Sequence, residues 1–400
     1  MRGFFSSTLL LAMATVIHAL RIIILSFLLG NADFGAVSTI LLLATLFSEF
    51  GALGFSQLIY NQPLFHPGRV SRQSRRIGLF FLTGMGLLLA SAAAVAAIAS
   101  AISVFEFVTI FLTLFCAASN MMVLSACRSS RGSFTHPIAY FIKSIIVILD
   151  IVILGFFTPP LSQMALWGEV VALPILLFYA WYVGILKLRW TTVREVPAIF
   201  AGHFKLGLTA IASAASGMLF FNQERLFGVA ALTLEQLGIL TKLLLPKMIA
   251  AQGAFLLGVH FHRMIVRMSE ADRSALFARA KQYERFAGPI AMLAVAGGGY
   301  LVVQLNALVY SIAIDYPTGL AVTVLALIFF FNPYSIMLQA SNRYTSLAIA
   351  NSIAVTGFIA LVALVGPLDP GVAVLSAIAA CLWFLIVRIL VACSFSARSG

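Results

Sequence analysis

The chain has 400 residues, of which 62% are hydrophobic and only 10% are charged. Soluble globular domains are about 45–50% apolar and about 25% charged, so this composition excludes a cytosolic enzyme, a secreted disulfide scaffold and a disordered protein. The net charge of +12 does not require a nucleic-acid partner, because basic residues that flank membrane helices explain it.

Continuous apolar runs predict an all-α polytopic membrane protein, because a helix of about 20 apolar residues crosses a bilayer. The strands of a membrane barrel would instead alternate in segments of about 10 residues. The first run follows Arg2 and is similar to a signal peptide, but further runs come after it, so we interpret it as an uncleaved span. In chain order, the breaks in hydrophobicity predict about 12 spans: 5–29, 34–60, 77–99, 102–126, 137–157, 163–186, 204–223, 236–261, 286–309, 317–339, 344–365 and 371–394.

The basic residues predict the orientation of these spans. When the N-terminus is placed inside, the inner connections carry most of the 25 Lys and Arg residues, whereas the outer connections hold Asp33, Asp315 and Asp369. Membrane proteins place Lys and Arg on the cytoplasmic side in this way. The sequence therefore predicts a multi-pass protein of the bacterial cytoplasmic (inner) membrane, with both termini in the cytoplasm.

The longest inner connection, 262–285, carries apolar residues at helical spacing among basic ones, including Leu276 and Phe277. We interpret it as an amphipathic segment on the anionic inner leaflet, with a solvated helical hairpin as the alternative. The division into two lobes is placed earlier, at the basic stretch 187–200. The predicted domains are six-helix lobes formed by residues 1–200 and 201–400.

A short pattern recurs at equivalent places in the two halves. Near the outer end of the first span, Arg21 is followed by an apolar stretch, by Asp33 and by a glycine that opens the next span. In the second half, Arg225 and Glu235 occur in the same order at nearly the same spacing. This pattern suggests a parallel repeat, in which two lobes of six helices surround a central cavity.

Some ionisable residues fall inside the predicted spans, where an isolated charge costs about 2.5–3.5 kcal/mol. Arg21 lies well inside the first span, and Lys242 and Lys247 lie inside the eighth, where Pro246 can kink the helix. We interpret these three basic residues as lining a water-filled cavity. The alternative is structural pairing with an acid in a span: Glu49, Asp150 or Glu169.

The intramembrane cations concentrate in the second half of the chain, where Arg225 joins Lys242 and Lys247. Cationic groups in a cavity suit an anionic substrate such as a phosphate or pyrophosphate. The candidate substrate-binding residues are Arg21, Arg225, Lys242 and Lys247. The candidates for ion coupling or structural pairing are His18, Glu49, Asp150 and Glu224. His18 alone is more typical of a satisfied buried histidine.

Absent motifs limit the chemistry of the chain. The sequence contains no ATP-binding P-loop, no H-E-x-x-H pair and no loop similar to a selectivity filter. The cysteines have no spacing typical of a metal site or a disulfide framework. We therefore predict a protein that is not an enzyme, with no catalytic residue, no metal and no cofactor.

Stretches in both halves of the chain carry a resemblance to a known family. Residues 29–35 read LGNADFG and residues 46–57 read LFSEFGALGFSQ, which resembles the first two spans of polysaccharide-export flippases. In the second half, residues 222–228 read NQERLFG and residues 235–238 read EQLG, which resembles the "D-R-x-x-x-G … e-x-x-G" segment of the same proteins. The family is that of the Wzx-type O-antigen and exopolysaccharide flippases, within the multidrug/oligosaccharidyl-lipid/polysaccharide (MOP) exporter superfamily.

The resemblance implies a flippase that works by alternating access. Its substrate would be an oligosaccharide on undecaprenyl pyrophosphate, moved from the inner to the outer leaflet for polysaccharide biosynthesis. Its partners would be the bilayer and the polysaccharide polymerase and export machinery. The resemblance carries over a basic residue in the first span, Arg21, and basic residues in the seventh and eighth spans, whereas Glu224 replaces the usual Asp.

Two alternatives remain open. One is a cation-coupled small-molecule or drug antiporter of the same fold, although the first span lacks the carboxylate through which the drug-extruding branch couples cations. The other is a membrane-embedded glycan-modifying enzyme, for which His18 is the one weak candidate.

Overall fold

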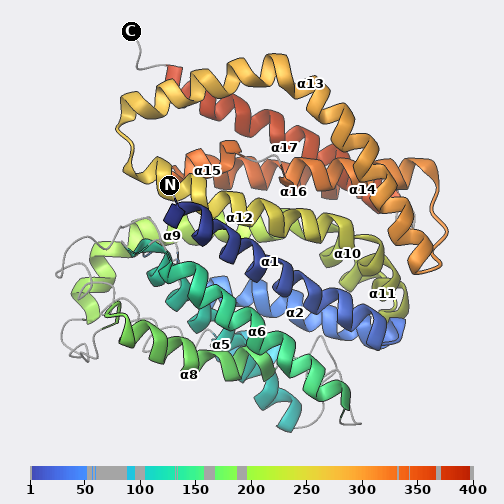
Figure 1. Ribbon diagram of the computed structural model, residues 1–400. Coiled ribbons are helices and arrows are strands. Elements are labelled where there is room, and N and C mark those ends of the chain that lie inside the picture. Colours follow the sequence, from blue (N-terminus) through green and yellow to red (C-terminus); the bar gives the residue numbers. More distant parts are fainter. Residues whose placement is uncertain are drawn as a thin grey trace. The chain divides into compact units, whose positions relative to one another are not determined.

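The computed structural model of the chain is built from helices (Figure 1). It describes residues 2–51, 56, 59, 88–94, 104–130, 132, 134–156, 167–186, 196–330, 333–341, 343–365 and 371–396. Every element within these ranges is an α-helix, so the all-α class predicted from the apolar runs is confirmed for this part of the chain.

The helices group into two compact units, Met1–Met218 (unit 1) and Leu219–Gly400 (unit 2), and each is described by itself. The border between them lies within α9 (Val196–Phe221), as does the predicted border between 200 and 201. The predicted lobes of residues 1–200 and 201–400 stay a prediction.

Unit 1 is a bundle of apolar helices in which α1 packs along α6, both α6 and α5 pack on α8, and α2 packs on α5 (Figure 1). Hydroxyls in this apolar interior are satisfied by their own helices; Thr113, for example, donates to the carbonyl of Thr109 at 2.8 Å. The helices are α1 (Arg2–Leu28), α2 (Asn31–Gly51), α5 (Val104–Ser129), α6 (Thr135–Phe156) and α8 (Trp167–Tyr182).

Unit 2 packs around α12, α14 and α17. The first of these lies along α14 and α15, and α17 lies along α14 and α16 (Figure 1). The helices are α10 (Gln223–Ala231), α11 (Leu234–Leu243), α12 (Leu245–Arg267), α13 (Glu270–Val309), α14 (Tyr316–Phe330), α15 (Pro333–Ala340), α16 (Tyr344–Val365) and α17 (Gly371–Ser396).

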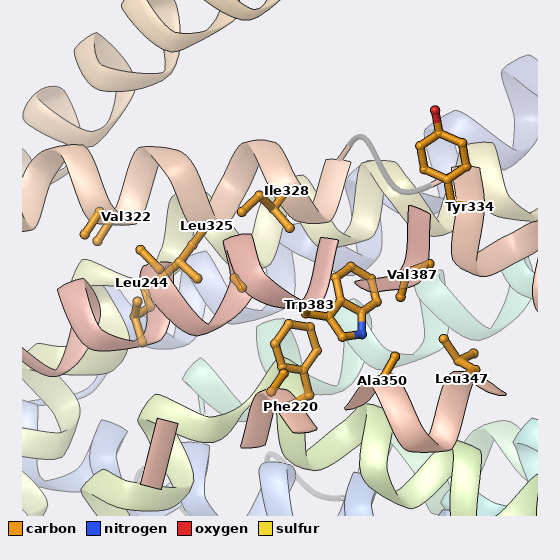
Figure 2. Packing of buried hydrophobic residues seen from close by; sticks show 14 of the residues in the cluster. Phe220, Leu244, Val322, Leu325, Ile328, Tyr334, Leu347, Ala350, Trp383 and Val387 are labelled. Carbon is orange, nitrogen blue, oxygen red and sulfur yellow. The ribbon is translucent and has the colours of Figure 1, made fainter. Parts of the chain in front are cut away.

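The core of unit 2 is centred on Trp383, which is 1% exposed. Its ring lies 4.8 Å from that of Phe220, and Figure 2 shows the two rings between Leu325 and Ala350. The indole N–H is not left unsatisfied by this burial, because it donates to Asn351 Oδ1 at 2.6 Å. This core fixes the position of α17, which contributes a side chain to the site described below.

Within the described ranges, five helices are long and apolar enough to cross a membrane: Ser6–Leu28, Phe107–Ser129, Thr135–Ile153, Tyr344–Val365 and Val372–Ser394. Shorter apolar helices lie at several other predicted spans, including Trp167–Tyr182 and Tyr316–Ile328. The count of about 12 spans stays a prediction, and the predicted span 77–99 lies largely outside the described residues.

The end predicted for the seventh span is wrong. That span is predicted to end at 223, but helical structure continues through α10 to Ala231. The eighth span, predicted to begin at 236, nearly coincides at its start with α11, which begins at Leu234. The polar residues that follow Phe221 interrupt the hydrophobic pattern without ending the helical segment. Each span is instead divided in two, at Asn222 and at Leu244, and Pro246 lies in the first turn of α12, where its missing N–H is tolerated.

The packing of Phe277 contradicts the interpretation of 262–285 as an amphipathic segment on the inner leaflet, and the order helix, turn, helix agrees with the helical hairpin given as the alternative. The stretch is divided between the end of α12 and the start of α13, which continues without a break to Val309. Ser269 caps α13 by accepting from Asp272 N at 3.1 Å. Phe277 does not point to lipid but packs in the core of unit 2 against Tyr334, with 6.2 Å between the ring centres.

Candidate functional site

The polar cluster of unit 1 is centred on Glu169, a buried residue in the first turn of α8. Lys143 Nζ on α6 lies 3.0 Å from one carboxylate oxygen, and Arg21 Nη1 on α1 lies 3.6 Å from the other. Asn120 Nδ2 on α5 donates both to the carboxylate and to the backbone carbonyl of Glu169, each at 2.9 Å. Side chains from three helices thus converge on the carboxylate that α8 carries.

A glycine places Glu169 in this cluster. A Cβ atom added to Gly168 would lie 3.0 Å from Val147 Cα and 3.2 Å from Asp150 Oδ2. The first turn of α8 can therefore approach α6 closely only because residue 168 has no side chain. Lys143 lies one turn from Val147 along α6, so the close approach brings its ammonium to Glu169.

Two of the predicted coupling residues of unit 1, His18 and Asp150, lie beside the cluster, outside the ion pairs given above. His18 lies one turn before Arg21 on α1, with its ring 5.7 Å from that of Tyr140. Neither His18 Nδ1 nor Asp150 Oδ2 has a hydrogen-bond partner among the described residues. Glu49 lies in α2, but its side chain lies outside the description.

The polar cluster of unit 2 is centred on Glu224, which is 0% exposed. Lys247 Nζ lies 2.8 and 2.7 Å from the two carboxylate oxygens and donates to the carbonyl of Phe221 at 2.8 Å. Ser376 on α17 donates its hydroxyl to the same carboxylate. Gln223 Nε2 donates to Ser376 Oγ at 2.7 Å.

The unit 2 cluster lies where the seventh and eighth spans are divided. Glu224 is the second residue of α10, directly after the break at Asn222, and Lys247 is the third residue of α12, directly after the break at Leu244. Arg225, next to Glu224, is 7% exposed. Because α10 continues to Ala231, Arg225 lies six residues before the end of its span, and Arg21 lies seven residues before Leu28.

Lys242 lies apart from this cluster. Its ammonium lies 5.5 Å from the ring centre of Tyr310, and its backbone carbonyl accepts from Asn306 Nδ2 at 2.9 Å. Asn306 lies near the C-terminal end of α13, and Tyr310 directly follows that helix. The four predicted substrate-binding residues are therefore divided: Arg21 is in unit 1, Arg225 and Lys247 lie together in unit 2, and Lys242 faces α13.

Sequence reasoning missed the uncharged members of both clusters: Asn120, Gln223 and Ser376. Asn120 was detectable, because an amide in the middle of an apolar helix needs a hydrogen-bond partner. Ser376 carries no such signal, since a serine in a membrane helix usually bonds to its own backbone. The sequence offers Glu169 only as one alternative pairing partner, whereas the structure places it at the centre of the polar cluster of unit 1.

The two clusters differ in charge. In unit 1 the basic Arg21 and Lys143 are matched in number by Glu169 and Asp150. In unit 2 three basic residues, Arg225, Lys242 and Lys247, are buried, whereas Glu224 is the one buried carboxylate among the described residues of this unit. Unit 2 therefore has surplus positive charge among its described buried residues. No three His, Cys, Asp or Glu side chains in the described ranges are placed to hold a metal ion.

Comparison with known proteins gives structural neighbours and no sequence family. No family profile matches the chain, and no curated protein matches it. A solved structure of a MATE in complex with MaL6 superposes with a TM-score of 0.68 at 15% identity, over 99% of this chain and 96% of that one. The chain has the fold of MATE transporters of the MOP superfamily.

Two further neighbours support this fold. One is an outward-facing multidrug resistance MATE family transporter, with a TM-score of 0.66 at 14% identity over 98% of this chain and 97% of that one. The other is a MOP superfamily transporter from Pyrococcus furiosus, with a TM-score of 0.63 at 15% identity over 98% and 96%. For the transporter from Pyrococcus furiosus, a reversed polarity of the binding pocket suggests a different function. The MATE fold is that of a multi-pass membrane protein, in keeping with the apolar helices.

Proposed function

We propose that the protein is a membrane transporter that works by alternating access. The observation that carries this proposal is the likeness to MATE and MOP transporters over nearly the full length of both chains. The five long apolar helices and the two buried polar clusters support it, because ionisable groups inside membrane spans are typical of substrate and ion pathways.

For the substrate we propose an anionic molecule, with Arg225, Lys242 and Lys247 of unit 2 as the groups that recognise it. The surplus positive charge of these buried residues supports this choice, since phosphate oxygens bind Arg and Lys strongly. An oligosaccharide linked to undecaprenyl pyrophosphate fits the charge and the resemblance described above. In this proposal the protein is a Wzx-type flippase of the bacterial inner membrane, serving a polysaccharide polymerase and export machinery.

The second candidate is a cation-coupled small-molecule or drug antiporter. The neighbours favour it over the flippase, because they include a multidrug resistance MATE family transporter. Glu169 and Glu224 provide one buried carboxylate in each unit. Against it, α1 contains no Asp or Glu, and basic side chains already engage both carboxylates.

The deciding experiment compares two phenotypes of one set of strains. In the source bacterium we would delete the gene and restore it as wild type, as Arg225→Gln, or as Arg388→Gln, which removes a basic residue of α17 far along the helix from Ser376. Surface polysaccharide, susceptibility to cationic drugs and protein level are measured for each strain.

The flippase proposal expects surface polysaccharide to be lost in the deletion and in Arg225→Gln at normal protein level, and retained in Arg388→Gln. Drug susceptibility should not change. A deletion strain with intact polysaccharide and raised drug susceptibility would establish the antiporter instead. If the deletion changes neither phenotype, both substrate proposals are overturned.

A further inference from the structure

The outer parts of the seventh and eighth spans form a hairpin with matched arms. Helix α10 has 9 residues and α11 has 10, and they are joined through Leu232 and Thr233. At 1.5 Å per residue, the breaks at Asn222 and Leu244 both lie roughly 14 Å from this turn. The two breaks are therefore level with each other along the hairpin.

The two helices of the hairpin pack closely and are joined by a capped turn, so they form one body. A Cβ atom on Gly228 would lie 2.8 Å from Leu237 Cδ1, so the glycine lets α10 and α11 pack in close contact. The turn is fixed by a capping box, in which Gln236 N donates to Thr233 Oγ1 at 3.3 Å and Thr233 N donates to Gln236 Oε1 at 3.0 Å.

Side chains take over part of the backbone bonding at both breaks, beside helical bonds such as Leu226 N to Asn222 O and Leu244 N to Leu240 O. Pro246 has no N–H to offer the carbonyl of Lys242, which accepts from Asn306 Nδ2 and from Leu244 N. At the other break, the carbonyl of Phe221 accepts from Lys247 Nζ. A helix interrupted in this way bends more easily than a continuous one, since fewer backbone bonds have to be broken.

Two groups of polar contacts tie the hairpin to the rest of unit 2. On α11, the carbonyl of Lys242 accepts from Asn306, and the Lys242 ammonium lies 5.5 Å from the ring centre of Tyr310. On α10, Gln223 donates to Ser376, and Glu224 forms the ion pair with Lys247. Glu224 belongs to α10, whereas Lys247 belongs to α12 and Ser376 to α17. Both of those helices are held by long contacts with α14. The other contacts of the hairpin include apolar ones such as Phe227 on Phe358, with ring centres 6.4 Å apart, which are not directional.

We infer that α10 and α11 tilt as a hairpin about Asn222 and Leu244, and that Glu224, bound by Lys247 and Ser376, is the latch that holds the hairpin in the observed position. The inference does not depend on which substrate is carried. A charged group that competes for Lys247 or for Glu224 would release the latch.

The test measures distances within unit 2 by pulsed electron spin resonance in lipid nanodiscs. Cys381 and Cys393 are first replaced by Ser, because both are exposed. The hairpin pair of spin labels is placed at Leu234→Cys and Leu364→Cys, which are 51% and 83% exposed. A reference pair without the hairpin uses Leu320→Cys on α14 with Leu364→Cys.

The variant Glu224→Gln/Lys247→Gln removes both charges of the latch while keeping the side chains similar in size. The matched control is Lys242→Gln, which removes a buried cation from the hairpin itself, together with its contact to the Tyr310 ring, and leaves Glu224, Lys247 and Ser376 in place. Ser376→Ala is a milder variant that keeps both charges, and it replaces the double variant if that protein is not obtained folded.

We expect a second distance for the hairpin pair to rise above about 10% of the population in the double variant, from a minor share in the parent protein. Ser376→Ala should shift the distribution in the same direction by a smaller amount, and the reference pair and the Lys242→Gln control should not change. An unchanged hairpin distribution in the latch variants overturns the inference. So does equal broadening of the reference pair, because it shows a general loosening of unit 2.

Discussion

Each unit buries a carboxylate inside an apolar helix bundle, and in each case basic side chains hold it. Glu169 lies 3.0 Å from Lys143, and Glu224 lies 2.7 Å from Lys247. Removing two ions from water is costly, and a buried pair recovers that cost only with good geometry and further hydrogen bonds. Asn120 and Ser376 supply those hydrogen bonds. Removing one partner should therefore be much worse than removing an exposed charge.

Glu169→Gln tests this expectation in unit 1. The variant leaves Arg21 and Lys143 buried without the carboxylate that they share, so we expect a loss of about 3 kcal/mol in stability. Thermal unfolding of the purified protein in detergent measures the change. Glu235→Gln, at an exposed position in the first turn of α11, is the control and should unfold close to the parent. Equal unfolding temperatures for the two variants would contradict the role given to Glu169.

Trp383 is the residue on which the packing of unit 2 depends most. Trp383→Ala removes a side chain that is 1% exposed and leaves a cavity beside Phe220, so we expect a loss of about 3–5 kcal/mol. Leu385→Ala, on the same helix but 53% exposed, should cost far less. Thermal unfolding separates the two variants, and a similar loss for both would show that Trp383 is not a core residue.

Helix boundaries in this protein are decided by caps and polar contacts as well as by hydrophobicity. For α16 and α17, where the apolar run ends at a turn, the predicted spans 344–365 and 371–394 nearly coincide with Tyr344–Val365 and Gly371–Ser396. For α10 the hydrophobic pattern fails, because its first residues are polar and are satisfied by tertiary contacts. Such contacts depend on the folded bundle and leave no periodic pattern in the sequence.

The junction between α12 and α13 offers a test at the scale of the element. Arg273, in the first turn of α13, donates from Nε to the carbonyl of Ile265 at 2.9 Å, near the end of α12. Arg273→Ala leaves that carbonyl without this donor, so we expect a loss of about 1 kcal/mol and faster amide hydrogen exchange in the last turn of α12. Arg279→Ala, at an exposed position of the same helix, should leave the exchange rate unchanged. If both variants exchange alike, Arg273 does not stabilise the junction.

At the scale of the whole molecule, the two occurrences of the sequence pattern lie in similar local structure, because Asp33 and Glu235 each lie in the first turn of a helix, α2 and α11. The parallel repeat itself stays a prediction. The pattern could be read from spacing, but its contacts could not, because Glu169, which pairs with Arg21, and Ser376, which donates to Glu224, lie far away in the sequence.

Thiol labelling of cells tests the predicted topology. With the exposed native cysteines replaced by Ser, Asp315→Cys should react with a membrane-impermeant maleimide in intact cells, because it lies on a predicted outer connection. Arg279→Cys should react only after the inner membrane is permeabilised. Both positions are exposed, so a lack of reaction reflects the membrane and not burial. The reverse pattern would contradict cytoplasmic termini.

The unbroken course of α13 has a mechanical consequence. Its 40 residues extend over about 60 Å, twice the thickness of a hydrocarbon core of about 30 Å, and Figure 1 shows them as one curved helix. Its basic first turns therefore reach beyond the bilayer on the predicted cytoplasmic side. The far end stops at Tyr310, whose ring lies under Lys242. One continuous helix therefore joins the predicted cytoplasmic tip of α13 to the neighbour of Lys242, a candidate substrate-binding residue. A protein bound to that tip would be linked through a single helix to the opposite side of the membrane.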